Sequence, residues 1–252
     1  MSRLAPFFLA AVLLAVWEAC CRLLSVPPYF LPAPSAILQA LIDRWPLLLS
    51  SSGHTLLMAL GGLLFATLIA LPLAMLAASS RWASAAFRPF AVTVQVTPIV
   101  AIAPLVVIWA GLDNSERAVM ALAAVVAFFP LFSGALTGLT SADPDLERLF
   151  DLYDAKPLDR LLRLRLPSAV PFMLEGLSVA AGQAVIGAVV AEFVAGSGQS
   201  QGLAWRILEA GNRLRTAEMF AALVVLAALG LIIHALIRWL RTLALTRFSE
   251  GR

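Results

Sequence analysis

Apolar residues occur along the chain in six long runs that are separated by shorter polar segments. Each run has about the 20 residues that an α-helix needs to cross the hydrocarbon core of a bilayer. The runs are continuously apolar rather than alternating, which indicates helices and not the strands of a membrane barrel. The predicted spans are Leu4–Leu24, Thr55–Ala78, Phe90–Leu112, Ala118–Leu139, Ala169–Ala195 and Met219–Leu240. This pattern predicts an all-α, polytopic membrane protein formed by a single transmembrane domain over residues 1–252.

The composition supports a membrane protein and excludes several other classes. Hydrophobic residues make up 61% of the 252 residues and charged residues 13%, whereas a soluble domain has about 25% charged residues. Lys156 is the only lysine among 18 basic residues, so no Lys-rich tract for nucleic acid is present. Two cysteines and two histidines are too few for a metal centre of usual spacing. We therefore expect no catalytic residue, no bound metal and no nucleic-acid partner.

The first run differs from a cleaved signal sequence. It follows a single positive charge, Arg3, exceeds a typical apolar signal region, contains Glu18 and is not followed by an A-x-A site. We interpret it as a retained helix in which Glu18 and Arg22, one turn apart, can pair.

Basic residues predict the orientation in the bilayer. Six spans place both termini on one side, and positively charged residues concentrate on the cytoplasmic side. With the N-terminus inside, the inner segments hold twice as many basic residues as the outer segments. The inner residues are Arg3, Arg81, Arg88, Arg148, Lys156, Arg160, Arg163, Arg165, Arg238, Arg241, Arg247 and Arg252; the outer ones are Arg22, Arg44, Arg117, Arg206, Arg213 and Arg215. We therefore expect cytoplasmic termini and a cytoplasmic segment at residues 141–168.

The segment at 141–168 has the pattern of two short amphipathic helices. Asp143 and Pro144 are an N-cap and a first helical residue, and Pro157 restarts a helix after an interruption. The first apolar stripe is Leu146, Leu149, Phe150 and Tyr153; the second is Leu158, Leu161, Leu162 and Leu166, with Arg160 and Arg163 expected to face away. Leu166-Pro167 is expected to end the second helix. The alternatives are a solvated loop and a docking surface for another protein.

This segment resembles the EAA loop of ABC-transporter permeases served by binding proteins, whose consensus is E-A-A-x3-G-x9-I-x-L-P. When Leu166-Pro167 is aligned with the final Leu-Pro, Leu164 falls at the isoleucine and Asp154 at the glycine. The residues at E-A-A are then Arg148, Leu149 and Phe150, so the end of the motif matches and its beginning does not.

Two other stretches are similar to the nitrate, sulfonate and taurine branch of these permeases. Residues 30–40 contain the F-L-P-x-P pattern, and residues 97–111 resemble the P-x-x-A-x-x-P-L…W-x-G pattern of the third span. The loop has Leu149-Phe150 where the consensus has Ala-Ala, and in this respect it also resembles the loop of permeases for pyrimidine precursors of thiamine. The resemblance covers the chain from Phe30 to Leu240.

The resemblance implies a type I importer permease of the bacterial inner membrane that works as a pair, as a homodimer. It implies an ABC ATPase dimer docked on residues 143–167, an external solute-binding protein, and a solute such as a sulfonate, taurine, nitrate or a pyrimidine precursor. The coupling helix of the family is matched by residues 151–158. The ATPase-coupling residues would be Arg148, Leu149, Phe150, Asp151, Tyr153, Asp154, Ala155, Lys156, Pro157, Leu158, Leu166 and Pro167.

The chain itself has no nucleotide-binding P-loop. A P-loop needs Gly-Lys-Ser/Thr after a glycine-rich turn, and the single lysine, Lys156, lies between Ala155 and Pro157. We therefore expect no enzyme activity and no cofactor on this chain, with ATP bound by a partner subunit.

Polar residues in the third and fifth spans are candidates for a translocation path. Pro98 and Pro104 free the carbonyls of Val94 and Val100 from helical partners, and such carbonyls are tolerated where protein or a water-filled cavity satisfies them. The candidate path residues are Gln95, Thr97, Pro98, Gln183 and Glu192. The alternative for each is helix–helix hydrogen bonding, worth about 0.6 kcal/mol on average. For Glu192, as for Glu175, the alternative is a carboxylate that reaches water at the membrane interface; His234 has no assigned role.

Small residues line two spans. Gly134 and Gly138 form G-x-x-x-G, and Ala180, Ala184 and Ala188 share one face of the fifth span. Such faces allow close helix packing, either within the chain or across a dimer.

Two other functions remain as alternatives. A secondary carrier driven by an ion gradient would be expected to show inverted repeats and a charged site at mid-membrane, and the sequence has neither. An intramembrane protease would have to use Ser197 with His234, but Ala195-Gly-Ser-Gly198 lacks the first glycine of G-x-S-G and lies at a helix end.

Overall fold

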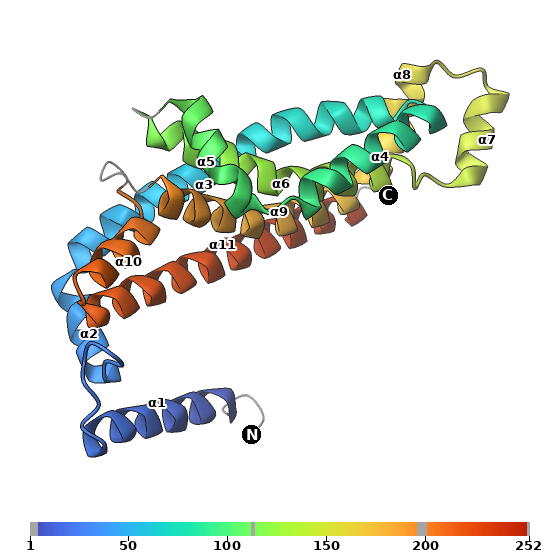
Figure 1. Ribbon diagram of the computed structural model, residues 1–252. Helices are drawn as coiled ribbons and strands as arrows, with labels where there is room; N and C mark the ends of the chain where they lie inside the picture. Colours follow the sequence, from blue (N-terminus) through green and yellow to red (C-terminus); the bar gives the residue numbers. More distant parts are fainter. Residues whose placement is uncertain (1–4, 112–113, 196–200, 251–252) are drawn as a thin grey trace. The chain divides into compact units, whose positions relative to one another are not determined.

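The computed structural model describes residues 5–111, 114–195 and 201–250, and within these ranges every regular element is a helix (Figure 1). The all-α prediction is therefore confirmed. The helices are α1 (Ala5–Leu23), α2 (Pro34–Asp43), α3 (Trp45–Ala78), α4 (Arg81–Val96), α5 (Ile99–Ala110), α6 (Ser115–Leu139), α7 (Pro144–Leu152), α8 (Pro157–Arg160), a π-helical turn η1 (Leu161–Arg165), α9 (Leu166–Val194), α10 (Leu203–Asn212) and α11 (Thr216–Glu250).

Four helical segments of the described chain are long and apolar enough to cross a bilayer, and a bent pair of helices adds a fifth candidate. The four are Trp45–Ala78, Ser115–Leu139, Pro157–Val194 and Thr216–Thr246. They correspond to the second, fourth, fifth and sixth predicted spans, and each of the four begins before the predicted first residue. The first predicted span forms α1, a helix of 19 residues that is not one of these candidates. The chain is therefore a multi-pass membrane protein, and the total of six crossings stays a prediction.

The third predicted span is not one straight helix. It forms α4 and α5, whose axes differ by 96° across Thr97 and Pro98. Proline lacks the N–H that would continue the helix and disfavours helical geometry in the residue before it; Thr97 accordingly has φ −68° and ψ 124°. Pro104, by contrast, lies inside α5. The break that the sequence predicts at Pro98 is therefore present, and a single broken span formed by this bent pair of helices stays a prediction.

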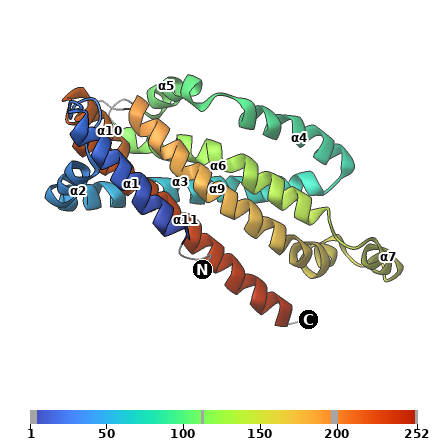
Figure 2. The ribbon, with the colours of Figure 1, turned by 90° about the horizontal axis from the view of Figure 1, so that it is seen from below.

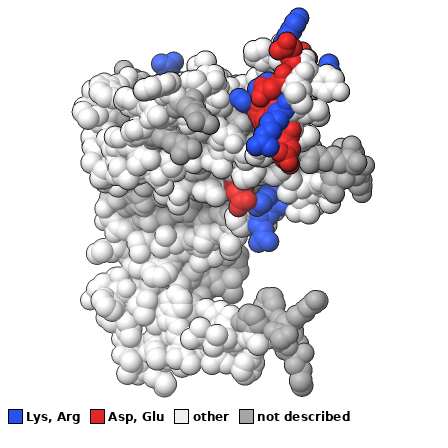
Figure 3. Space-filling model, turned by 90° about the vertical axis from the view of Figure 1, so that its right-hand side faces the viewer, with Lys and Arg blue, Asp and Glu red and all other residues white. Residues whose placement is uncertain are grey.

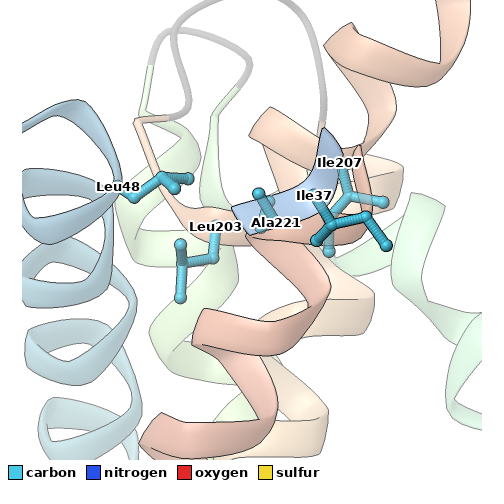
Figure 4. Packing of buried hydrophobic residues seen from close by; sticks show 6 residues of the cluster. Ile37, Leu48, Leu203, Ile207 and Ala221 are labelled. Carbon is cyan, nitrogen blue, oxygen red and sulfur yellow. The ribbon is translucent and has the colours of Figure 1, made fainter. Parts of the chain in front are cut away.

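The chain divides into two compact units, and the first comprises residues 1–55 and 200–229. Its core joins α2, the beginning of α3, α10 and the beginning of α11 (Figure 4). The buried side chains there are Ile37, Leu48, Leu203, Ile207, Ala221 and Ala222. The Thr55 hydroxyl accepts a hydrogen bond from the Leu203 amide at 2.9 Å, which anchors α10 to α3.

Helix α1 belongs to this first unit and is tied to α2 by a polar contact. Arg22 Nε lies 2.6 Å from a Glu18 carboxylate oxygen, which confirms the predicted pair. The same carboxylate accepts hydrogen bonds from the Ser35 amide and hydroxyl at 3.0 and 2.8 Å. The N-terminal residues of α2 are therefore held by a side chain of α1.

The second unit comprises residues 56–199 and 230–252 and is built around α6 and α9, which lie side by side in Figures 1 and 2. The two helices approach so closely that glycine is required at their contact. A Cβ added to Gly176 would lie 2.5 Å from the Pro130 carbonyl oxygen, and one added to Gly138 would lie 2.7 Å from the Ala169 Cα. The G-x-x-x-G face of α6 therefore packs within the chain, against α9, which answers the question that the sequence left open.

Candidate functional site

Two short helices, α7 and α8, form a hairpin that projects from one end of α6 and α9 (Figure 1). We refer to residues 143–165 as the α7–α8 hairpin. Asp143 caps α7, since its carboxylate accepts a hydrogen bond from the Asp145 amide at 2.8 Å, and Pro144 is the first helical residue. Pro157 begins α8. The predicted starts of both helices are therefore confirmed.

The turn between the two helices has a left-handed residue where the consensus has glycine. Asp154 has φ +48°, and its amide donates to the Asp151 carbonyl at 3.2 Å while the Ala155 amide donates to the Phe150 carbonyl at 3.0 Å. This pattern is a Schellman motif, which usually places glycine at the left-handed position. Asp154 therefore occupies the conformation that glycine would adopt with less strain.

Ion pairs hold the two arms of the hairpin together. Glu147 on α7 accepts from Arg165 Nε at 2.7 Å and lies 3.3 Å from Arg160 Nη1, and Arg160 also pairs with Asp151. Figure 3 shows acidic and basic side chains gathered over this region. Most of the other described residues on that face are neither acidic nor basic and are drawn in white. The prediction that Arg160 faces away is wrong, because its guanidinium turns toward the carboxylates of α7; Arg163 is exposed and pairs with Asp159 on its own arm.

Glu147 is the residue of the hairpin that the sequence analysis missed. It lies one position before Arg148, which the alignment places at the consensus glutamate. Its carboxylate is mostly covered, with 22% of the side chain exposed. The available signal was an acidic residue next to the expected acidic position, together with three arginines in the second predicted helix.

The second arm of the hairpin does not follow the predicted apolar stripe. Residues 161–165 form a π-helical turn, so the spacing of an α-helix does not apply there. Leu164, which lay outside the predicted stripe, is the leucine that becomes buried, whereas Leu158 and Leu162 are exposed. The expected helix end at Leu166-Pro167 is also wrong: the helix continues into α9. The wider turn just before Pro167 accommodates a residue that lacks an N–H.

The tip of the hairpin presents large apolar side chains. Leu152, Tyr153 and Leu158 are 84%, 77% and 65% exposed. They lie beside a turn whose backbone is fixed by hydrogen bonds and whose arms are joined by ion pairs. The hairpin thus combines a stiff framework with an uncovered apolar tip.

We expect Glu147→Gln to loosen the hairpin without unfolding the membrane helices. The change removes the two ion pairs that Glu147 makes with the second arm and leaves the pair between Arg160 and Asp151 in place. It should cost about 1–2 kcal/mol of local stability, because charged hydrogen bonds that are partly screened have this value. Hydrogen–deuterium exchange at α7 amides should rise about tenfold. Asp145→Asn is the matched control, since the ion pair of Asp145 with the exposed Arg148, at 2.9 Å, lies within α7 and does not join the two arms. Equal exchange in both variants would contradict the bracing role of Glu147.

A cavity of about 320 Å³ lies within the second unit, between the α4–α5 bend, α6 and α9. Three predicted path residues line it together: Gln95, Thr97 and Gln183. Pro98 does not line the cavity but forms the bend beside it. The complete lining is Val94, Gln95, Thr97, Ile99, Val125, Val126, Phe129, Pro130, Gln183 and Ile186.

The ionisable residues of the spans lie elsewhere. Glu192 is fully buried, with 0% exposure, and is not part of this cavity lining; an interfacial carboxylate reaching water is therefore the wrong interpretation for it. Glu175 is exposed and pairs with Arg241 at 2.7 Å, as an interfacial residue would. His234 is exposed on α11, and Ser197 lies outside the described residues.

Comparisons with known proteins agree with this architecture. Residues 70–247 match the family described as binding-protein-dependent transport system inner membrane component. The chain is 36% identical to a probable ABC transporter permease protein of Haemophilus influenzae, over 94% of this chain and 95% of that protein.

Two further relatives carry substrate names. The formylaminopyrimidine transport permease protein ThiX of Halalkalibacterium halodurans is 30% identical over 97% of this chain and 96% of its own length. A putative aliphatic sulfonates transport permease protein SsuC of Bacillus subtilis is 28% identical over 92% of this chain and 83% of its own. These relatives belong to the branch that the sequence patterns resemble.

The family consists of membrane components of transport systems and not of enzymes, which removes the support for an intramembrane protease. The multi-pass helices, the hairpin at the expected EAA position and the match over residues 70–247 lead to the same conclusion. The chain belongs to the binding-protein-dependent inner membrane components of ABC transporters, which are their permease subunits.

Proposed function

We propose that this chain is the permease of an ATP-driven importer and that its α7–α8 hairpin docks on a separate ABC ATPase dimer. A second copy of the chain would complete the transmembrane path, and an external binding protein would deliver the solute. The excess of arginine in the segments on the hairpin side supports an orientation with this hairpin and both termini in the cytoplasm.

The observation that carries the proposal is the exposed apolar tip on a braced hairpin. Soluble surfaces rarely leave several large apolar side chains uncovered together unless another protein covers them. Leu152, Tyr153 and Leu158 meet this description, and the ion pairs of Glu147 keep them in a fixed arrangement. A rigid hairpin that is bound by the ATPase can transmit a rigid-body motion of the ATPase to α6 and α9.

The solute is not identified by the family. The names of the relatives include a formylaminopyrimidine and aliphatic sulfonates, and the branch resemblance adds taurine and nitrate. We propose a small organic or anionic nutrient of this range as the transported solute.

Charge placed at the tip of the hairpin tests the docking. We expect Leu152→Asp and Leu158→Asp each to weaken association with the proposed ABC ATPase by about 30-fold or more, since a buried apolar anchor contributes about 2 kcal/mol at an interface. Copurification of tagged permease with the ATPase measures this loss.

The matched control is Leu214→Asp, because Leu214 is comparably exposed, at 71%, but lies between α10 and α11 in the first unit. This control should retain the ATPase. If all three variants copurify with the ATPase as well as the wild type does, the hairpin is not the docking element.

A further inference from the structure

We propose that the solute crossing this permease is an uncharged, flat nitrogen heterocycle and not a sulfonate, nitrate or other anion. This inference rests on the proposed import function and narrows its solute class. It follows from the chemistry of the cavity between the α4–α5 bend, α6 and α9.

The first argument is the absence of charge. Among the ten described residues that line the cavity, none has an ionisable side chain. Pores and sites that pass anions usually supply arginine or lysine to replace the lost hydration of the ion. In a homodimer a second copy would contribute the same uncharged residues, so the pairing of two chains would add no positive charge at this level.

The second argument is the set of hydrogen-bonding groups. Gln95 and Gln183 each offer two N–H donors and a carbonyl acceptor. The Val94 carbonyl would have bonded to the amide of residue 98, but Pro98 has no N–H, so this carbonyl is available as a further acceptor. Such a mixture of neutral donors and acceptors matches ring nitrogens and exocyclic amino or carbonyl groups.

The third argument is the shape and polarity of the rest of the lining. Phe129 and Pro130 on α6, with aliphatic side chains from four helices, provide apolar surface for the faces of a ring. Small-molecule sites are typically apolar cavities of about 300–1,000 Å³ with a few placed polar groups. The volume of about 320 Å³ is at the lower end of that range, which suits a solute of one or two rings.

Uptake by the complete importer tests the solute class. The permease, its ATPase and its binding protein are reconstituted in proteoliposomes with internal ATP, and uptake of labelled solutes is measured. The panel contains uncharged heterocycles of one or two rings, such as aminopyrimidines and purines, on one side and ethanesulfonate, taurine and nitrate on the other. We expect uptake of at least one uncharged heterocycle and of none of the three acids. Uptake of ethanesulfonate, taurine or nitrate would overturn the inference, and so would a complex that transports no member of the panel.

Substitutions in the cavity link the solute to these residues. Gln95→Leu and Gln183→Leu should each lower the uptake rate of the heterocycle about tenfold, the effect of one lost hydrogen bond, without changing copurification with the ATPase. Gln39→Leu, the same change at an exposed glutamine of α2, should leave uptake unchanged. Wild-type uptake kinetics in both cavity variants would overturn the assignment.

Different results would contradict the import function and the assignment of the solute. Absence of a complex with the ATPase, or of ATP hydrolysis stimulated by the binding protein, would contradict the import function itself. An active, coupled importer that moves an anion would contradict only the assignment of the solute.

Discussion

Gly176→Leu is expected to destroy the packing of α6 against α9 and with it the fold of the second unit. Even a Cβ at this position would lie 2.5 Å from the Pro130 carbonyl oxygen and 3.4 Å from the Gly134 Cα. Both are backbone atoms, so they cannot move aside as a flexible side chain could. The two helices would have to separate along their contact, which we expect to cost about 3 kcal/mol or more.

The expected result is a fall in the thermal unfolding midpoint of the detergent-purified chain by about 6–12 °C, or loss of monodisperse protein. Gly176→Ala should show the same direction with a smaller effect, because its single Cβ already meets the backbone of α6.

Gly182 provides a matched control on the same helix. A Cβ at Gly182 meets no atom within 4 Å. Gly182→Ala should therefore raise stability by about 0.5–1 kcal/mol, since alanine is the better helix former. Equal effects of Gly176→Ala and Gly182→Ala would show that the close approach of α6 and α9 is not what requires glycine at position 176.

The elements that local chemistry determines were predictable from the sequence. The Asp143-Pro144 cap, the restart at Pro157 and the small-residue face of α6 each depend on residues that are adjacent or one turn apart. Long apolar runs likewise located four of the crossing helices, because hydrophobic length is a property of the segment itself.

The features that depend on tertiary contacts were not predictable. Arg160 turns toward Glu147 because α7 lies opposite, and periodicity within one helix contains no information about a facing helix. The π-helical turn at residues 161–165 changes which leucine is buried, so the stripe based on α-helical spacing identified the wrong side chain. At Pro98 the sequence indicated a break, but it did not give the 96° angle between α4, which packs on α6, and α5, which packs on α6 and α9.

The residues proposed for the translocation path include three that the structure brings together at the cavity and one that it places elsewhere. Gln95, Thr97 and Gln183 were selected as polar groups in apolar spans, the first two because they also lie beside the helix break, and the structure brings these three together. Glu192 was selected by the same argument and is buried away from this lining. Polarity alone thus identifies residues with a role in the bundle, but it does not distinguish a path from a buried internal contact.

Replacing Asp154–Leu158 with five glycines is expected to abolish ATPase association while the permease remains inserted. The change removes the apolar Leu158 side chain and also Pro157, which begins α8. Glycine has no side chain to bury and a high conformational entropy, so the tip would lose both its contact surface and its fixed direction. We expect copurification with the ATPase to fall by about 100-fold or more and ATP-driven uptake to disappear.

A single-site control separates the surface of the tip from its backbone geometry. Asp154→Gly alone keeps Pro157 and Leu158 and places glycine at φ +48°, a conformation that glycine adopts readily. This variant should bind the ATPase as well as the wild type does and should unfold at the same or a slightly higher temperature. If the five-glycine variant still copurifies with the ATPase and transports at the wild-type rate, the ATPase docks on another part of the chain. If Asp154→Gly alone abolishes association, the Asp154 carboxylate makes the contact and the apolar tip does not.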